Sequence, residues 1–448
     1  MVRDVQETVG IILAGGRGER AKPITLESAD HIRSKALIPL AGRRLIEWVV
    51  DACREQGIRR FFVVAQGLEN RGQIKAVLGH GERHGVEVRY SRPRFDRYNV
   101  GSGAATLHNV EQWDLQGDAL VLPVDSLFDF SLQEMLDSHR ERRALVTVAA
   151  VEREPEEIAG KYGVMVTGSD GWVTSFEEKP DLARMREIFP ESARTAGPGL
   201  PTNAGMYLID CGRLRAVARR PPLLRLAHQR LDWGGDLLPW LVKHGAPVTF
   251  HSIRSLGDLG NVQDYLDTLT DVLAGRYPQI SRMLGEPTSE RPRYWIHESS
   301  LRTTDDLTGT TLAQKIAEGS VHIGEGVRIG RHVTIGEGVS LAYCDIGDGA
   351  DLREGARLER TFCGDAAMIG PCAWATDAYI GPMAEVQSEA GLTTRLNRYT
   401  AVGDGARLSA GSRLEGVRVY PRLAVPSLDH VPVGTELTSS NDVLRWVS

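Results

Sequence analysis

The sequence predicts an α/β protein in which a Rossmann-like, mostly parallel sheet is followed by a left-handed parallel β-helix. Two observations lead to this fold class. Residues 9–270 alternate short apolar segments with amphipathic ones, which is typical of strands and helices that follow one another in a parallel sheet. From about residue 321 a six-residue repeat of aliphatic residues and glycine takes over, the pattern of a β-helix with triangular coils.

The elements of the first part follow from local patterns. Leu45, Trp48, Val49 and Ala52 share one helical face, and Gly57 is the expected C-cap of that helix. A second amphipathic segment covers residues 132–142. Ligands of parallel sheets bind beyond the carboxyl ends of the strands, so the loops after the strands are the expected site. The apolar runs that predict buried strands are residues 9–14, 59–65, 118–124 and 144–151.

The repeat of the second part places inward-facing aliphatic side chains six residues apart, with one five-residue step. Residues 321–420 hold 16 of the 48 glycines, which are expected at coil corners. The pattern loosens near Cys363–Gly370 and recurs weakly at Ile380-Gly381 and Val402-Gly403, which predicts coils with insertions in this stretch. We therefore expect a catalytic domain at 1–275, a connection at 276–320 and a β-helix domain at 321–448. The aliphatic positions are Ile323, Ile329, Ile335, Leu341, Ile346, Leu352 and Leu358, and the small or β-branched positions four residues later are Val327, Val333, Val339, Ala350 and Ala356.

Composition excludes several classes of protein. The chain has 53 Lys and Arg against 59 Asp and Glu, a formal charge of −6, which argues against a broad nucleic-acid surface or a polybasic membrane patch. No apolar run approaches the roughly 18 residues of a membrane-spanning helix. Residues 1–8 lack the pattern of a secretory signal. Five scattered cysteines indicate reduced thiols in a cytoplasmic protein.

The loop after the first predicted strand combines glycines with cations. Gly15, Gly16 and Gly18 would let backbone N–H groups approach phosphate oxygens. Arg20 adds a planar donor and Lys35 a point charge, the two cation types that suit phosphate. The spacing matches neither common phosphate-binding loop. A tight turn would also need these glycines, so the loop alone leaves a purely structural role equally open.

Residues 13–40 as a whole resemble the signature of the sugar-1-phosphate nucleotidyltransferases, a family in which appended hexapeptide coils also occur. The family pattern is a Leu-Ala-Gly-Gly loop, Gly-x-Arg, Pro-Leu-Thr and Pro-Lys-x-Leu. Two departures, Ala21 for leucine and Ser34 for proline, remove no charged group. Further segments are similar to family elements in the family's order: Val100–Ala105, Val121–Phe128 with Asp125, Tyr162–Val164, Phe176–Pro180, Thr202–Tyr207, and Leu256–Asn261 with Asp258.

The resemblance implies an activity. A sugar phosphate oxygen would attack the α-phosphate of a nucleoside triphosphate and release pyrophosphate, with Mg²⁺ as cofactor. It favours ATP or GTP, with a sugar or sugar-like cyclitol 1-phosphate as the second substrate. Because both reactants are anions, the expected work of the protein is charge neutralisation and alignment.

The resemblance also implies the site residues. Asp125 and Asp258 would hold Mg²⁺, an ion that commonly takes one or two carboxylates beside phosphate oxygens, although an aspartate that opens a turn is the simpler interpretation of each alone. The implied catalytic residues are Arg20, Lys35, Asp125, Lys179 and Asp258. The implied nucleotide-binding residues are Leu13, Ala14, Gly15, Gly16, Gly18, Arg20, Gly101 and Ser102, and the sugar-phosphate-binding residues are Gly163, Glu178, Lys179 and Asn203.

Two other functions fit the same architecture. A non-catalytic regulatory subunit could bind nucleotide sugars, although the charged positions that a dead relative tends to lose are all present. Acyl transfer by the coils would use His322 or His332 as a base, but a solvated coil face is the more common place for such histidines. The β-helix is expected to assemble a homo-oligomer or to hold an effector site.

Overall fold

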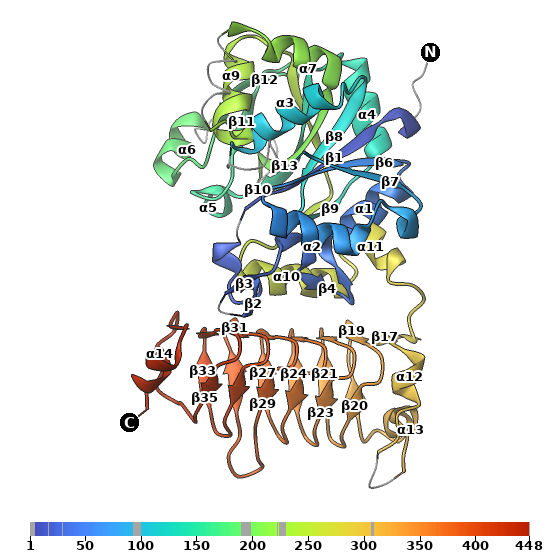
Figure 1. Ribbon diagram of the computed structural model, residues 1–448, viewed down its shortest axis with the longest axis vertical. Coiled ribbons are helices and arrows are strands. Elements are labelled where there is room, and N and C mark those ends of the chain that lie inside the picture. The colour runs from blue at the N-terminus through green and yellow to red at the C-terminus, as the bar shows by residue number, and fades with distance from the viewer. Residues whose placement is uncertain are drawn as a thin grey trace. The chain divides into compact units, whose positions relative to one another are not determined.

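The computed structural model (Figure 1) describes residues 5–16, 18–28, 30–92, 100–189, 199–221, 223, 230–305 and 309–447. Their contacts divide the chain into two compact units. The first consists of Met1–Gly16 and Ile46–Leu256, and the second of Arg17–Leu45 and Gly257–Ser448. Each unit is therefore assembled from two separate stretches of sequence.

The first unit contains a nine-stranded sheet with a parallel core. Its order is β12-β11-β13-β8-β1-β6-β7, and β10 pairs with both β13 and β14. The pairs β8-β1, β1-β6, β6-β7 and β10-β14 are parallel, whereas β13 runs antiparallel to β8, β10 and β11. The strands are β1 (Val9–Ala14), β6 (Arg60–Ala65), β7 (Glu87–Tyr90), β8 (Asp118–Pro123), β10 (Val146–Arg153), β11 (Val164–Thr167), β12 (Val173–Glu177), β13 (Leu200–Asp210) and β14 (Val248–Ser252).

Helices cover both faces of this sheet, because alternate residues of the central strands are buried on either side. Val9 and Ile11 of β1 join one cluster with residues of α3, α7 and α9. On the other face α4 contacts β10, and His139 Nδ1 lies 2.8 Å from Thr147 Oγ1. The helices are α1 (Leu45–Glu55), α2 (Leu68–Leu78), α3 (Ser102–Gln112), α4 (Leu132–Glu141), α5 (Pro155–Ile158), α6 (Leu182–Ile188), α7 (Cys211–Ala218) and α9 (Leu238–Lys243), with a π-helix at Trp233–Leu237.

The second unit contains a parallel β-helix with three faces, so the predicted fold class is confirmed. The first face has the order β16-β17-β19-β22-β25-β28-β31-β34-β36, the second β18-β21-β24-β27-β30-β33 and the third β20-β23-β26-β29-β32-β35. Apart from the antiparallel pair β16-β17, neighbouring strands run parallel.

The strands of the first face are β16 (Ser289–Glu290), β17 (Arg293–Ile296), β19 (Val327–Ile329), β22 (Asp345–Ile346), β25 (Phe362–Cys363), β28 (Ala378–Ile380), β31 (Thr400–Val402), β34 (Arg418–Val419) and β36 (Glu436–Leu437). Those of the second are β18 (His322–Ile323), β21 (Ser340–Ala342), β24 (Arg357–Glu359), β27 (Trp374–Thr376), β30 (Arg395–Asn397) and β33 (Arg413–Glu415). Those of the third are β20 (Thr334–Ile335), β23 (Asp351–Leu352), β26 (Met368–Ile369), β29 (Glu385–Val386), β32 (Arg407–Leu408) and β35 (Ala424–Val425).

The register of the coils explains the single five-residue step in the sequence. Asp345 pairs with Phe362 and Phe362 with Tyr379, so one coil takes 17 residues, two steps of six and one of five. The expected insertion lies in the later part of the predicted stretch, because the 17-residue register continues unbroken through Met368, which pairs with Glu385. Small inward side chains at Cys363 and Ala375 weaken the repeat there without lengthening the coil. The longer coil comes later, where Tyr379 pairs with Ala401.

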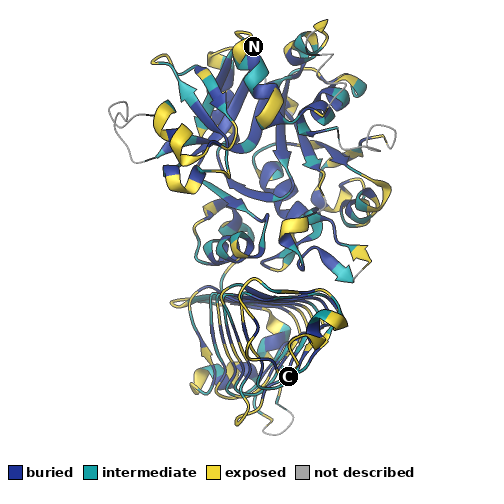
Figure 2. Ribbon diagram, turned by 90° about the vertical axis from the view of Figure 1, so that its left-hand side faces the viewer, coloured by how far each residue is buried: buried dark blue, intermediate teal, exposed yellow. Residues whose placement is uncertain are grey.

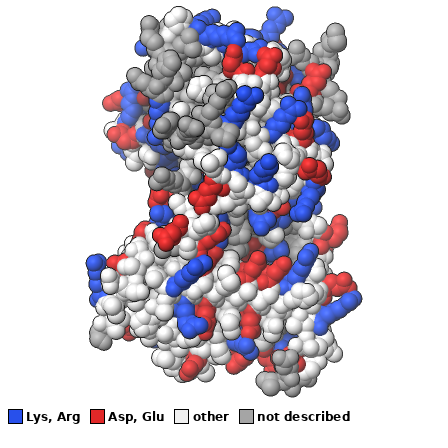
Figure 3. Space-filling model, viewed as in Figure 1, with Lys and Arg blue, Asp and Glu red and all other residues white. Residues whose placement is uncertain are grey.

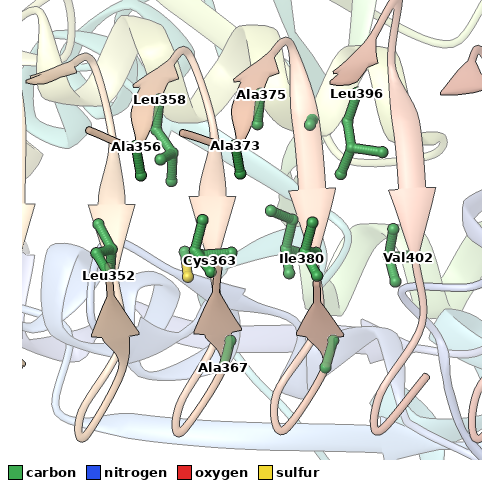
Figure 4. Close-up of a cluster of buried hydrophobic side chains, with 14 of the residues drawn as sticks. Leu352, Ala356, Leu358, Cys363, Ala367, Ala373, Ala375, Ile380, Leu396 and Val402 are labelled. Carbon is green, nitrogen blue, oxygen red and sulfur yellow. The ribbon is translucent and has the colours of Figure 1, made fainter. Parts of the chain in front are cut away.

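The core of the β-helix is a stack of the predicted inward positions. Leu352, Leu358, Ile380 and Val402 point into the interior from β23, β24, β28 and β31, with smaller alanine side chains in the same stack (Figure 4). Figure 2 shows the coils from their end, with buried residues along the inner sides. On the face shown in Figure 3, Lys and Arg are interspersed with Asp and Glu over both units. Within the described residues, no helix is long and apolar enough to span a membrane.

Residues of the first part also pack on the first face of the β-helix, within the second unit. Tyr265 of α10 lies edge-on to Phe362 and Tyr379, at 5.9 and 5.7 Å between ring centroids, and its hydroxyl donates to the Pro39 carbonyl at 2.8 Å. Asp345 accepts from the Gly42 N–H at 3.3 Å and pairs with Arg328 at 2.7 Å. The short elements of this unit are β2 (Leu26–Ser28), β3 (His31–Ile32), β4 (Pro39–Leu40), β5 (Arg43–Arg44), α10 (Val262–Leu273), α11 (Pro278–Met283), α12 (Glu298–Leu301), α13 (Leu312–Ala317) and α14 (Ser440–Leu444).

Candidate functional site

The first unit contains a pocket of 670 Å³ at the carboxyl ends of its parallel strands. Leu13 lies near the end of β1, Val64 near the end of β6 and Pro123 at the end of β8, and all three line it. Its position is the one that ligands of such sheets occupy, and its volume is typical of small-molecule sites. Ten of the predicted site residues line this pocket: Leu13, Gly15, Gly16, Gly101, Ser102, Asp125, Gly163, Glu178, Lys179 and Asn203.

The glycine loop continues directly from β1. Gly16 has a φ of 90°, a conformation that glycine adopts without strain. Ala14 is buried in β1 rather than part of the pocket lining, and its carbonyl accepts from Asn70 Nδ2 at 2.6 Å. The pairing of Ala14 with Ala65 of β6 and this hydrogen bond fix the end of the strand, and the two glycines that follow line the pocket.

The N-terminus of α3 is fixed by a segment 130 residues away. Asp232 Oδ1 accepts from the backbone N–H of Ser102 at 3.0 Å, and the Trp233 N–H donates to Ser102 Oγ at 3.0 Å. Gly101 has a φ of 88°, and a Cβ there would lie 2.4 Å from the Leu231 carbonyl oxygen. Both the conformation and the close backbone contact require glycine. As a result, Gly101 and Ser102 are held firmly at the pocket wall.

Glu178 lies between two glycines of the pocket wall. A Cβ at Gly163 would be 2.8 Å from Glu178 Oε2, and one at Gly234 would be 2.5 Å from the same oxygen. Burial raises the pKa of Glu178; Lys179 opposes that shift, and Asp232 and Asp236 reinforce it. The glycines thus give a partly desolvated carboxylate room to face the pocket.

Lys179 stands next to this carboxylate in an uncommon conformation. Its Nζ lies 3.6 Å from Glu178 Oε1, and its side chain is 57% exposed. Its φ of 49° is left-handed, which is rare for a residue other than glycine, asparagine or aspartate and is often found at functional sites. The backbone therefore presents an ammonium group at the pocket edge at some conformational cost.

The amide of Asn203 is oriented by two hydrogen bonds. Its Nδ2 donates to the Tyr207 hydroxyl at 3.1 Å, and its Oδ1 accepts from the Gly205 N–H at 2.9 Å. Tyr207 in turn stacks on Trp233, with ring centroids 4.4 Å apart. Trp233 is buried and donates from Nε1 to Thr106 Oγ1 at 2.9 Å. This packing fixes the position of Asn203 in β13.

Four predicted residues belong to the second unit instead: Gly18, Arg20, Lys35 and Asp258. A Cβ at Gly18 would lie 3.2 Å from Lys35 Cγ, so the lysine stem packs over the glycine. Arg20 Nη2 and Asp258 Oδ1 both lie beside Gly260, whose N–H donates to Asp258 at 2.8 Å. The structure thus gathers these four residues within one unit.

The carboxylates fit a hard, oxygen-seeking cation. Within the described residues there is no group of three or more His, Cys, Asp or Glu side chains that could hold a metal by themselves. Mg²⁺ does not need such a group, because it commonly takes one or two carboxylates together with substrate phosphates and waters. Asp125 in the pocket and Asp258 in the second unit are donors of this kind.

Sequence reasoning missed part of the pocket wall. Lys161, Arg230 and Gly235 also line it, and the Arg230 guanidinium pairs with Asp232 at 2.9 Å. Lys161 directly precedes the recognised Tyr-Gly pair, so its charge was a usable signal. The glycine pair at 234–235 was another, because consecutive glycines often mark a close approach of the backbone.

Comparisons with known proteins agree with this geometry. A family model described as nucleotidyl transferase matches residues 9–275. A UTP–glucose-1-phosphate uridylyltransferase of Synechocystis sp. is 26% identical over 382 residues, covering 83% of this chain and 86% of the relative. A glucose-1-phosphate adenylyltransferase of Thermomicrobium roseum is 29% identical over 276 residues, 57% of each chain. Glucose-1-phosphate adenylyltransferase 2 of Vibrio cholerae is 24% identical over 383 residues, 79% of this chain and 88% of the relative. Since the family model covers more than half of its residues, the chain belongs to the nucleotidyl transferase family.

Proposed function

We propose that this enzyme joins a nucleoside triphosphate and a sugar or cyclitol 1-phosphate into a nucleotide-sugar, with release of pyrophosphate. The single observation that carries this proposal is the pocket, whose lining includes the glycine loop after β1, Asp125 after β8, Lys179 after β12 and Asn203 within β13. Relatives named for glucose 1-phosphate support the acceptor class. They include both uridylyl- and adenylyltransferases, and we favour ATP or GTP as the triphosphate.

We assign the roles as follows. The nucleotide would bind along Leu13–Gly16 and at the N-terminus of α3, where Gly101 and Ser102 line the pocket. Arg20 and Lys35 would neutralise the triphosphate, since a guanidinium and an ammonium both stabilise phosphate oxygens. Lys179 would hold the sugar phosphate, and Glu178 and Asn203 would bind sugar hydroxyls beside the Gly163 backbone.

Charge neutralisation is the main chemical task of these residues, because two anions must approach in line. Asp125 and Asp258 would hold Mg²⁺. When bound, the ion would screen the phosphate charges and stabilise the negative charge that develops in the transition state. Lys179 and the fixed amide of Asn203 would orient the acceptor phosphate toward the α-phosphate.

The decisive experiment is a panel of ATP, GTP, UTP and dTTP against a set of sugar and cyclitol 1-phosphates with Mg²⁺, with pyrophosphate release as the readout. One pair should turn over, and Asp125→Asn should abolish that turnover. Asp137→Asn is the matched control, because this exposed carboxylate of α4 accepts a hydrogen bond from Gln133 in its own helix and does not line the pocket. Nucleotide-sugar binding without turnover of any pair would point instead to a regulatory subunit.

We further propose that residues 1–275 form the catalytic domain, 276–320 the connection and 321–448 the β-helix domain of a cytoplasmic homo-oligomer. The repetitive coil faces support assembly, since such faces stack well. Light scattering at working concentration should give a mass that is a multiple of the 49.2 kDa chain. A monomer would contradict this part of the proposal.

A further inference from the structure

A buried ion pair joins Arg33, in the segment between the glycine loop and α1, to a coil of the β-helix within the second unit. Arg33 Nη2 donates to Asp404 Oδ2, and the two residues are 371 positions apart in the sequence. Arg33 is 9% exposed and Asp404 is 6% exposed. Asp404 lies two residues beyond β31, which belongs to the same face of the β-helix as β28, the strand that α10 contacts. Arg33 Nε also lies 3.6 Å from Oε1 of Glu27, whose side chain is 44% exposed, so Asp404 is the closer and more buried counter-charge. Breaking the pair with Asp404 leaves the buried guanidinium with this longer and partly solvated ion pair.

Arg33 connects this coil to the predicted triphosphate residues by a short series of hydrogen bonds. Its Nη1 donates to the Ile24 carbonyl at 2.8 Å, and its N–H donates to the Thr25 carbonyl at 2.9 Å. Thr25 Oγ1 then donates to the Gly18 carbonyl at 2.9 Å. The side-chain stem of Lys35 packs over Gly18. Lys35 is also the first residue of a short 3₁₀-helix, Lys35–Leu37, which begins two residues after Arg33. These contacts link Arg33 to the Gly18 turn and to Lys35.

Among the coil corners compared below, Asp404 differs because its side chain does not accept the corner hydrogen bond that the equivalent aspartates accept. Asp348 and Asp365 occupy the equivalent corner, and both are exposed. Their Oδ1 atoms accept from the N–H that follows the corner glycine of the preceding coil: Asp348 from Arg331 and Asp365 from Asp348, each at 2.8 Å.

At the Asp404 corner, the residue that follows the corner glycine, Gly381, is Pro382, which has no N–H to donate. Accordingly, Oδ1 of Asp404 is buried without a hydrogen-bond partner. A buried carboxylate with no role in its own corner is costly, and Arg33 is the partner that compensates it.

We propose that Asp404 is a positioning residue for nucleotide binding, which holds Arg33 and through it the Gly18 turn and Lys35. This inference rests on the proposed function, in which Lys35 neutralises the triphosphate. Asp404 touches neither substrate. Its effect is on how well the triphosphate site is prearranged, so its loss should weaken the triphosphate more than the sugar phosphate.

The test compares Asp404→Asn with Asp365→Asn, which changes the same corner two coils earlier. Both substitutions keep the shape of the side chain. For the substrate pair that turns over in the panel, Asp404→Asn should raise the KM of the triphosphate by about 10- to 100-fold, the scale of a displacement of about 1 Å. The KM of the sugar phosphate should change by less than about twofold, and Asp365→Asn should leave both values unchanged.

Arg33 supplies the second set of variants. Arg33→Gln should raise the triphosphate KM as Asp404→Asn does, the double variant should be no worse than either single variant, and Arg33→Lys should restore part of the affinity. Equal KM values for Asp404→Asn and Asp365→Asn, or equal losses for both substrates, would overturn the inference. If the wild type turned over no substrate pair, the proposed function would fail separately. Calorimetric binding of inorganic tripolyphosphate to the same variants would then decide the inference, and unchanged affinity in Asp404→Asn would refute it.

Discussion

Replacement by alanine should have different effects on activity at two adjacent glycines of the pocket wall. Gly234 and Gly235 both lie in the π-helix that begins at Trp233, and neither has a left-handed φ. A Cβ at Gly234 would lie 2.5 Å from Glu178 Oε2, whereas a Cβ at Gly235 would meet no atom within 4 Å. Gly234→Ala should therefore displace the Glu178 carboxylate, and Gly235→Ala should leave it in place.

The size of the effect follows from the distance. Ordinary van der Waals contact begins at 3.4 Å, so the carboxylate must move by about 0.9 Å, which is enough to break a hydrogen bond to a substrate hydroxyl. A hydrogen bond to a charged group is worth about 1.5–3 kcal/mol, or about 10- to 150-fold in kcat/KM for the sugar phosphate. The clash is with the end of a flexible side chain, so the free energy of unfolding should fall by only about 1 kcal/mol.

The assay is steady-state kinetics with each substrate varied in turn, together with thermal unfolding. Gly234→Ala should lose kcat/KM for the sugar phosphate while its KM for the triphosphate stays the same. Gly235→Ala should change the free energy of unfolding by no more than about 0.5 kcal/mol. Although Gly235 lines the same pocket, this variant should lose much less kcat/KM for the sugar phosphate than Gly234→Ala. Equal kinetics in the two variants would refute the placement of Glu178 in the acceptor site.

Three further outcomes test other parts of the structure. Burial raises the folded-state pKa of Glu178, so its ionisation destabilises the fold above that pKa. Glu178→Gln should therefore raise the Tm at pH 8. The difference in Tm from wild type should vanish as the pH falls below the pKa values of Glu178 in the folded and unfolded protein. A constant difference in Tm from pH 4 to 8 would contradict this. Asp232→Ala removes the acceptor of the Ser102 N–H and should cost about 1 kcal/mol of stability in denaturant unfolding, together with a higher KM for the triphosphate; unchanged values would show that α3 starts without this cap. Phe362 stacks on Tyr379 with centroids 5.0 Å apart, so Phe362→Ala should cost about 3–5 kcal/mol in the same measurement, and a loss below about 1 kcal/mol would mean that the aromatic cluster is not a core.

Local pattern was enough to predict most elements of the fold. The apolar run at residues 9–14 is β1 (Val9–Ala14), and the helical face that begins at Leu45 is α1. The aliphatic period predicted the inward stack of the β-helix, since each coil repeats the same three corners. It failed at Cys363 and Ala375, because a small buried side chain carries little hydrophobic signal even when it occupies the inward position.

Contacts between distant residues were beyond a single sequence. Asp232 caps α3 from 130 positions away, and no spacing rule connects it to Ser102. The pocket residues Gly101 and Asn203 were predicted from their motifs, but the packing of Tyr207 on Trp233 that orients Asn203 depends on the folded sheet. Motifs therefore identified which residues to expect at the site, and tertiary packing determines how they are held.

The 17-residue register of the coils also has an evolutionary consequence. Removing one whole coil would keep every strand pair and corner of the β-helix, so coil number alone is easily changed by duplication or deletion. The segment before α1 limits that freedom, because it bonds to two places on the same face. Gly42 bonds to Asp345 in β22, and Arg33 bonds to Asp404 just after β31, which is three strands further along the face. Strands lie about 4.8 Å apart, so the two contacts are about 14 Å apart along the face, and the folded segment from Arg33 to Gly42 bridges that distance. Lineages of this chain can add or lose coils outside Asp345–Asp404 but should keep the number between them.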